Sequence, residues 1–167
     1  MIQAIVYTSH TGTTAQYAKM LGEKTGLPVY PLEQALKVLP AQTEILYLGW
    51  LMASMVKGYS QAAKRFRVTG VCGVCLGTTG SQLDQVRQNN RISQQTAVFT
   101  LQGGFDLQKL RGVYKMMMKM MTKVLTKEIT SKPEQTDQDR QILQMLHHGG
   151  SAVSEQHLTA VLQWLQA

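Results

Sequence analysis

Long apolar runs are absent from this chain of 167 residues, and so are the features of an export signal. No apolar stretch reaches the roughly 20 residues that a helix needs to cross a bilayer. The opening MIQAIVYTSH has neither a basic region nor a small-residue cleavage site. We therefore expect a cytoplasmic protein. The length and the hydrophobic fraction of 44% are typical of a single domain, residues 1–167, with its own core.

Cysteine is scarce too, because only Cys72 and Cys75 occur, in a C-x-x-C spacing. Such a spacing can belong to a redox pair or to half of a metal site. The valines and glycine around the two cysteines predict a buried strand, in which side chains three positions apart point to opposite faces. We therefore predict two thiols in the core and no metal site.

Three motifs are missing, and each absence excludes a class of protein. The chain lacks G-x-x-x-x-G-K-[ST], which excludes a P-loop nucleotide triphosphatase, and G-x-G-x-x-G, which excludes a dinucleotide site. It also lacks acids at the ends of the first and third predicted strands, where Thr8, Ser9 and His10 and then Gly49 and Trp50 stand. This excludes a receiver-type phosphorylation domain.

Apolar runs alternate with helical patterns along the first hundred residues. The predicted strands are 2–8, 28–32, 44–49, 69–76 and 96–101, and the predicted helices are 13–25, 53–66 and 81–91. The link at 32–38 is too short for more than about a turn or two of helix. Right-handed crossovers between such strands give a parallel sheet covered on both faces. We predict an α/β fold with a doubly wound five-stranded sheet in the order 2-1-3-4-5. Its ligand crevice would lie beyond the carboxyl ends of the strands.

Two extra helices follow the fifth predicted strand. The patterns predict helices at 107–126, 136–147 and 154–166, of which the last closes the domain. We therefore predict a helical insert at residues 105–150, with 103–106 as its hinge.

A phosphate-binding loop is predicted directly after the first strand. It consists of Ser9, His10, Thr11, Gly12, Thr13 and Thr14. Amides at the start of a helix point toward an anion with the positive end of the helix dipole behind them, and the hydroxyls add neutral donors. Taken alone, such a turn could equally be a simple helix cap.

The S-x-T-G-x-T pattern of this loop resembles the FMN phosphate loop of flavodoxins and flavodoxin-domain oxidoreductases. The resemblance implies FMN as cofactor, with its ring between the loops after the third and fourth strands. The ring contacts it implies are Trp50, Leu51, Met52 and Ala53, and then Gly77, Thr78, Thr79 and Gly80. Trp50 would offer a stacking surface, with core packing as the alternative. His10 falls at the family's variable position, where we expect it to face solvent.

Two departures from the family weigh against a classical low-potential electron shuttle. The proline usual after the third-strand glycine is missing, and no acidic cluster surrounds the expected ring site. Surrounding acids disfavour the fully reduced anion, whereas basic surroundings favour it.

Nearly all of the excess positive charge of the chain lies in one stretch. Residues 109–132 hold seven basic residues and the single acid Glu128, whereas the net charge of the whole chain is +7. This pattern favours a local docking face for something acidic and no nucleic-acid coat. The candidate docking residues are Arg111, Lys115, Lys119 and Lys123.

The helix in this stretch is also rich in methionine. Projected at about 100° per residue, its apolar residues cover roughly 200°, about twice what a surface helix needs. Three interpretations stay open: the next helix covers the surplus, the methionines cover a hydrophobic substrate beside the flavin, or the helix lies on an anionic membrane. The last would make the protein peripheral to a membrane.

The G-G-F-D turn at 103–106 and the Met- and Lys-rich helix after it are similar to those of flavodoxin-type, menaquinone-dependent protoporphyrinogen oxidases. The resemblance implies an FMN-dependent oxidoreductase or electron carrier, with a redox partner or a small hydrophobic substrate and quinone or porphyrinogen chemistry. No residue stands out as catalytic. The alternative is a non-catalytic interaction or membrane-docking module that has kept the fold.

Overall fold

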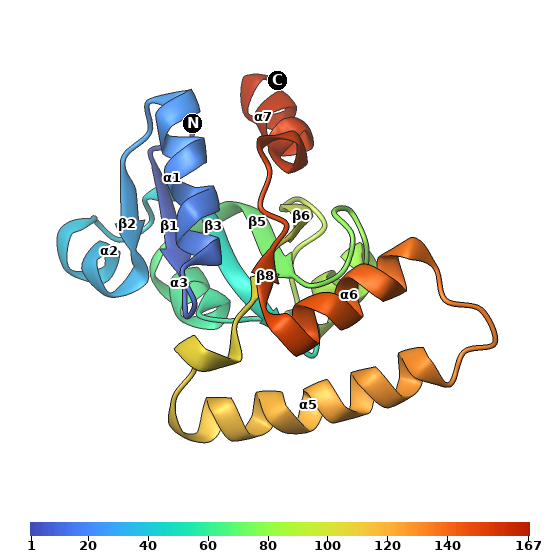
Figure 1. The fold of residues 1–167 in the computed structure, drawn as a ribbon. Coiled ribbons are helices and arrows are strands. Elements are labelled where there is room, and N and C mark those ends of the chain that lie inside the picture. The colour runs from blue at the N-terminus through green and yellow to red at the C-terminus, as the bar shows by residue number, and fades with distance from the viewer.

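The computed structural model describes residues 1–167, and its centre is a mostly parallel sheet (Figure 1). The parallel strands are β1 (Ala4–Thr8), β2 (Val29–Pro31), β3 (Glu44–Met52), β5 (Arg67–Cys75) and β6 (Ala97–Gln102). They run in the order β2-β1-β3-β5-β6, and the short β4 (Met55–Val56) pairs antiparallel with the end of β3. The predicted α/β class and parallel sheet are confirmed, while β4 is an addition to the predicted order.

β4 replaces the first part of the helix predicted at 53–66. Ala53 and Ser54 both have positive φ, at 49° and 60°, so the chain reverses between Met52 and Met55. Two left-handed residues in succession form the tight turn whose twist suits a hairpin. Helix α3 therefore begins only at Tyr59 and runs to Arg65.

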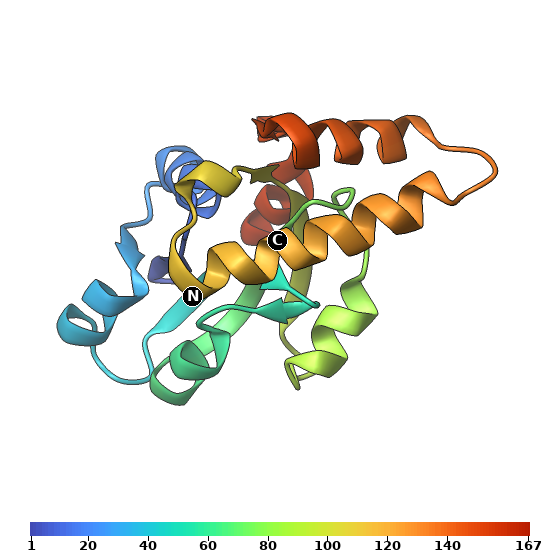
Figure 2. The same ribbon diagram turned by 60° about the horizontal axis from the view of Figure 1, so that its bottom comes forward.

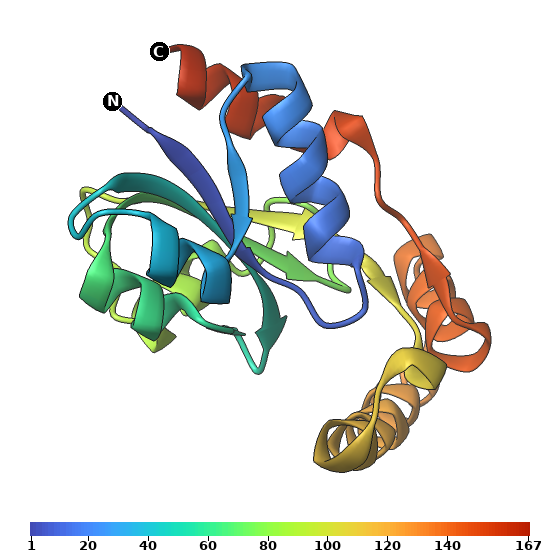
Figure 3. The same cartoon turned by 90° about the vertical axis from the view of Figure 1, so that its left-hand side faces the viewer.

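Helices cover both faces of the sheet (Figure 3). On one face α1 (Thr13–Thr25) and α7 (Thr159–Gln166) pack over side chains such as Ile5 and Leu48. On the other, α2 (Leu32–Val38), α3 and α4 (Leu83–Asn89) pack over Val6 and Tyr47. Neighbouring strand residues thus point to opposite cores, as the period of two requires.

The chain between β6 and α7 forms an arm at the carboxyl ends of the strands (Figures 1 and 2). It contains β7 (Gly104–Phe105), the 3-10 turn η1 (Leu107–Lys109), α5 (Gly112–Thr130), α6 (Asp137–His148) and β8 (Gly150–Ser151). A second 3-10 turn, η2 (Glu155–Leu158), leads into α7. The helix predicted at 107–126 therefore begins later and ends later than expected.

The predicted hinge at 103–106 is part of a ladder. β7 pairs antiparallel with β8, and the Ala152 N–H donates to the Gly103 carbonyl at 3.1 Å. A Cβ at Gly104 would lie 2.4 Å from the Gly150 oxygen, so the two strands approach as closely as glycine allows. The two ends of the arm are thereby held together.

Helix α6 begins with a capping box. Thr136 Oγ1 accepts from the Asp139 N–H at 3.1 Å, and the Asp139 carboxylate accepts from the Thr136 N–H at 3.0 Å. Lys132 Nζ lies 2.7 Å from the same carboxylate. These bonds lower the pKa of Asp139, with the Lys132 ammonium as the largest cause.

None of the helices combines the length and hydropathy of a bilayer-crossing segment.

Candidate functional site

The loop after β1 presents free backbone amides at the start of α1. Gly12 is the N-cap of the helix at φ 96°, and the first bond into the helix runs from the Gln16 N–H to the Gly12 carbonyl at 3.0 Å. The N–H groups of residues 13–15 precede that bond and have no acceptor within the helix. Ser9 Oγ accepts from the Gly12 N–H at 3.2 Å and so holds the loop closed.

Strand β3 carries the next group of predicted contacts. The sequence placed Trp50, Leu51 and Met52 in a loop, but β3 continues through Met52 because its hairpin with β4 extends the ladder. Trp50 and Leu51 line a cavity together with Ala53, which lies in the hairpin turn. Met52 is buried and lies outside the wall of the cavity.

The loop between β5 and α4 reaches the cavity at its two ends, and its middle residues do not. Gly77 lines the wall, whereas Thr78, Thr79 and Gly80 do not. Thr79 Oγ1 accepts from the Gln102 N–H at 2.9 Å, and the Gly80 N–H donates to the Thr100 carbonyl at 3.0 Å. These residues anchor the loop to β6.

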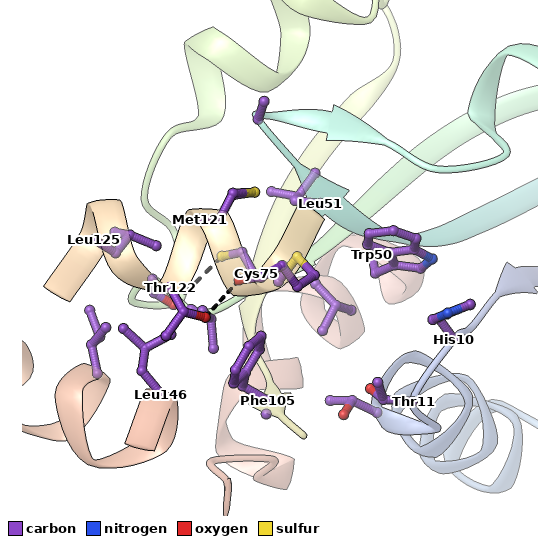
Figure 4. Close-up of a pocket in the computed structure, with 18 of the residues that line it drawn as sticks. His10, Thr11, Trp50, Leu51, Cys75, Phe105, Met121, Thr122, Leu125 and Leu146 are labelled. Carbon is purple, nitrogen blue, oxygen red and sulfur yellow. Dashed lines mark hydrogen bonds between the residues drawn. The ribbon is translucent and has the colours of Figure 1, made fainter. Parts of the chain in front are cut away.

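A cavity of about 330 Å³ lies between the arm and three other segments, which are the phosphate loop, the end of β3 with its hairpin turn, and the loop after β5 (Figure 4). From the phosphate loop, it is lined by His10, Thr11, Thr13 and Thr14, whereas Ser9 and Gly12 do not line it. Its other walls are mostly apolar and carry no carboxylate. The volume lies within the range of about 300–1,000 Å³ that is usual for small-molecule sites.

The contacts predicted from the sequence did not include the residues that the arm supplies to the cavity, although a cover of methionines was one of the open interpretations. These wall residues are Gly104, Phe105, Leu110, Met118, Met121, Thr122, Leu125, Ile142 and Leu146. Other wall residues outside the predicted contacts are Ser54, Val74, Cys75, Leu76 and Gln82. The methionine pattern was visible in the sequence, but only the fold shows which methionines face inward.

An aromatic cluster includes two residues of the cavity wall, His10 and Trp50. The ring of Tyr114, at the start of α5, lies 5.1 Å from the His10 ring and 5.9 Å from the Trp50 ring, centroid to centroid. Lys57 Nζ lies 5.5 Å from the centre of Trp50, within reach of a cation–π interaction. His10 is exposed, as predicted, and also packs on these rings. Trp50 is only half-buried, so it is no ordinary core residue.

The two cysteines differ in position. Cys72 is fully buried under α1 and α7, as predicted. Cys75 is only half-buried and lines the cavity, so the prediction of two core thiols is wrong for Cys75. Its thiol lies 3.6 Å from the Gly77 carbonyl oxygen. Cys75 is the last residue of β5 and still pairs with Gln102 of β6, so it lies at the carboxyl edge of the sheet, where the cavity begins. Burial raises the pKa of both thiols.

A second, polar hollow of about 250 Å³ lies beside the phosphate loop. Thr11 and Thr13 line it from the loop, and Asp106 and Lys109 line it from the arm. Lys109 Nζ lies 4.0 Å from the Asp106 carboxylate. The loop itself contains no Lys or Arg, so the arm contributes the lysine on this side of the loop.

No protein-family model, curated protein or solved structure matches the chain.

Proposed function

We propose that the chain binds FMN in the cavity and works as a flavodoxin-like, FMN-dependent oxidoreductase or electron-transfer protein. The observation that carries this proposal is a single cavity bounded by an amide-rich helix start at one end and by Trp50, Leu51 and Gly77 further along. Free amides and hydroxyls suit a phosphate, and an apolar wall with an indole suits a planar ring.

The chain's residues would have distinct roles toward FMN. The first amides of α1, with the hydroxyls of Thr11 and Thr13, would bind the phosphate. The arm, through Phe105 and Met121, would keep water from the ring. Because no carboxylate lines the cavity, none there opposes a negatively charged reduced ring. Bound FMN would supply the electron transfer, and the protein would supply binding and orientation.

The test is flavin binding by the purified protein. We expect visible flavin absorbance, or quenched fluorescence of added FMN. Thr11→Asp places a negative charge against the phosphate. Two like unit charges about 4 Å apart near a protein surface repel each other by about 4 kcal/mol. The Kd for FMN should therefore rise at least a hundredfold. Thr159→Asp, at the start of α7, is the matched control and should leave the Kd unchanged.

Two results would contradict the proposal. One is a folded wild-type protein that neither contains nor binds FMN. The other is equal binding by the Thr11→Asp and wild-type proteins.

The second candidate function is a non-catalytic interaction or membrane-docking module. It is favoured by the outer face of α5, where apolar side chains and lysines are exposed together. A folded protein without flavin binding would favour this function.

A further inference from the structure

The outer face of α5 is apolar and uncovered. Five residues on it are exposed by about half or more: Val113, Met116, Met117, Met120 and Val124, at 69%, 68%, 41%, 68% and 56%. At about 100° per residue they fall within a sector of roughly 100°, hereafter the methionine stripe. Helix α6 packs on another side of α5, where Met118, Leu125 and Ile142 meet. The interpretation that α6 covers the whole apolar surplus is therefore wrong.

A row of basic side chains borders the methionine stripe. Lys115, Lys119 and Lys123 follow one another at intervals of four, and Lys127 continues the row. None of these four forms an ion pair with an acid, and Glu128 is the only acid on α5. The row is thus a set of uncompensated positive charges beside exposed apolar surface.

The position of α5 leaves this face accessible. The arm projects from the sheet, and α5 is the part of it furthest from the sheet (Figures 1 and 3). The 19 residues of α5 give a helix about 28 Å long. The neighbouring side of α5 supplies Met118, Met121 and Leu125 to the cavity. One helix therefore separates the cavity from an exposed apolar face.

We propose that α5 docks the protein on an anionic lipid bilayer, with the methionine stripe among the acyl chains and the lysine row at the headgroups. A bilayer offers the apolar layer and the negative layer side by side, as the stripe and the row require. A second copy of the chain would bring a second lysine row with no acids to pair it. The docking does not depend on FMN, because the stripe and the row lie outside the cavity.

The test is co-sedimentation of the full chain with vesicles of phosphatidylcholine containing about a third phosphatidylserine, and with vesicles of phosphatidylcholine alone. We expect binding to the anionic vesicles that weakens as salt is raised. Changing Lys115, Lys119 and Lys123 to Gln should lower the partition coefficient about a hundredfold, because each charge contributes about 1 kcal/mol, or about fivefold. Met116→Ser with Met120→Ser should lower it at least tenfold without changing the charge.

The matched control changes Lys19, Lys37 and Lys64 to Gln. These exposed lysines lie on α1, α2 and α3, so the control removes the same charge from other surfaces. It should bind as the wild type does, and circular dichroism should show that every variant is folded.

Three outcomes would overturn the proposal. The first is equal retention by anionic and neutral vesicles, and the second is an equal loss of binding in the control and the α5 lysine variants. The third is a stable dimer in sedimentation that Met120→Ser dissociates, with no vesicle binding by the wild type. That result would assign the methionine stripe to a second copy of the chain.

Discussion

Gly12 and Gly26 allow the phosphate loop to be tested apart from overall stability. They flank the same helix, α1, at its start and its end. Both have positive φ, at 96° and 72°, and a Cβ added to either would meet nothing within 4 Å. Replacing either with alanine therefore creates backbone strain without a clash. The two variants differ in which end of α1 they disturb.

The strain should cost both variants the same stability. An L-residue in the left-handed region costs about 1–2 kcal/mol, which lowers the melting temperature of a domain of this size by about 2–8 °C. We expect thermal denaturation followed by circular dichroism to show this decrease for Gly12→Ala and for Gly26→Ala. This shared decrease makes Gly26→Ala the control for any general loosening of α1.

Only Gly12→Ala should weaken FMN binding. The strained loop can relax by returning residue 12 to negative φ, which turns the amides at the start of α1 away from the cavity. Fluorescence titration should then show a Kd raised at least tenfold, which corresponds to about 1.4 kcal/mol or more. Wild-type affinity in Gly12→Ala, or an equal loss in Gly26→Ala, would refute the assignment of these amides to the phosphate.

Three further predictions concern single residues. Lys109→Ala should weaken FMN binding and leave riboflavin binding unchanged, because Lys109 lies beside the phosphate loop; titration with both flavins checks this. Iodoacetamide should modify Cys75 before Cys72, and added FMN should slow the modification of Cys75, as mass spectrometry would show. Asp139→Asn should lower the melting temperature at pH 7. Because the pKa of Asp139 is lowered in the native state, its carboxylate contributes fully to the free energy of unfolding above the ordinary aspartate pKa of about 4. The melting temperatures of the wild type and the variant should therefore converge as the pH falls below that value.

The sheet and its flanking helices could be predicted from local patterns. β1 reads as an uninterrupted apolar run because Ile5 and Val6 point into two different cores, and parallel sheets bury both faces. Thr13 to Thr25 was predicted correctly, since Gly26 ends the helix in a left-handed conformation. These features depend on residues close together in the sequence.

The hairpin at the end of β3 could not be predicted in this way. Its turn uses Ala53 and Ser54 at positive φ, whereas the usual sequence signal for such a turn is Asn-Gly or Asp-Gly. The pairing of Leu51 with Val56 compensates for this strain, and that pairing is a property of the folded sheet.

The residues that the arm contributes to the cavity could not be predicted from local sequence patterns either. Met118 and Met120 look alike in the sequence, yet Met118 lines the cavity and Met120 is 68% exposed. Their difference depends on the place where α6 packs. That place depends in turn on β7 and β8, which are two residues each and too short to leave a pattern.

Because β7 pairs with β8, the arm is a structural unit that can be replaced without changing the sheet. Phe105 and Gly150 are partners across it, so the chain that leaves the sheet domain returns to almost the same point. Because the ends already meet, replacing the intervening residues with a short turn would add little loop-closure entropy and would leave β6 and α7 where they are. Lineages that share this sheet could therefore gain, lose or remodel such an arm, and with it the cover of the cavity, without rebuilding the domain.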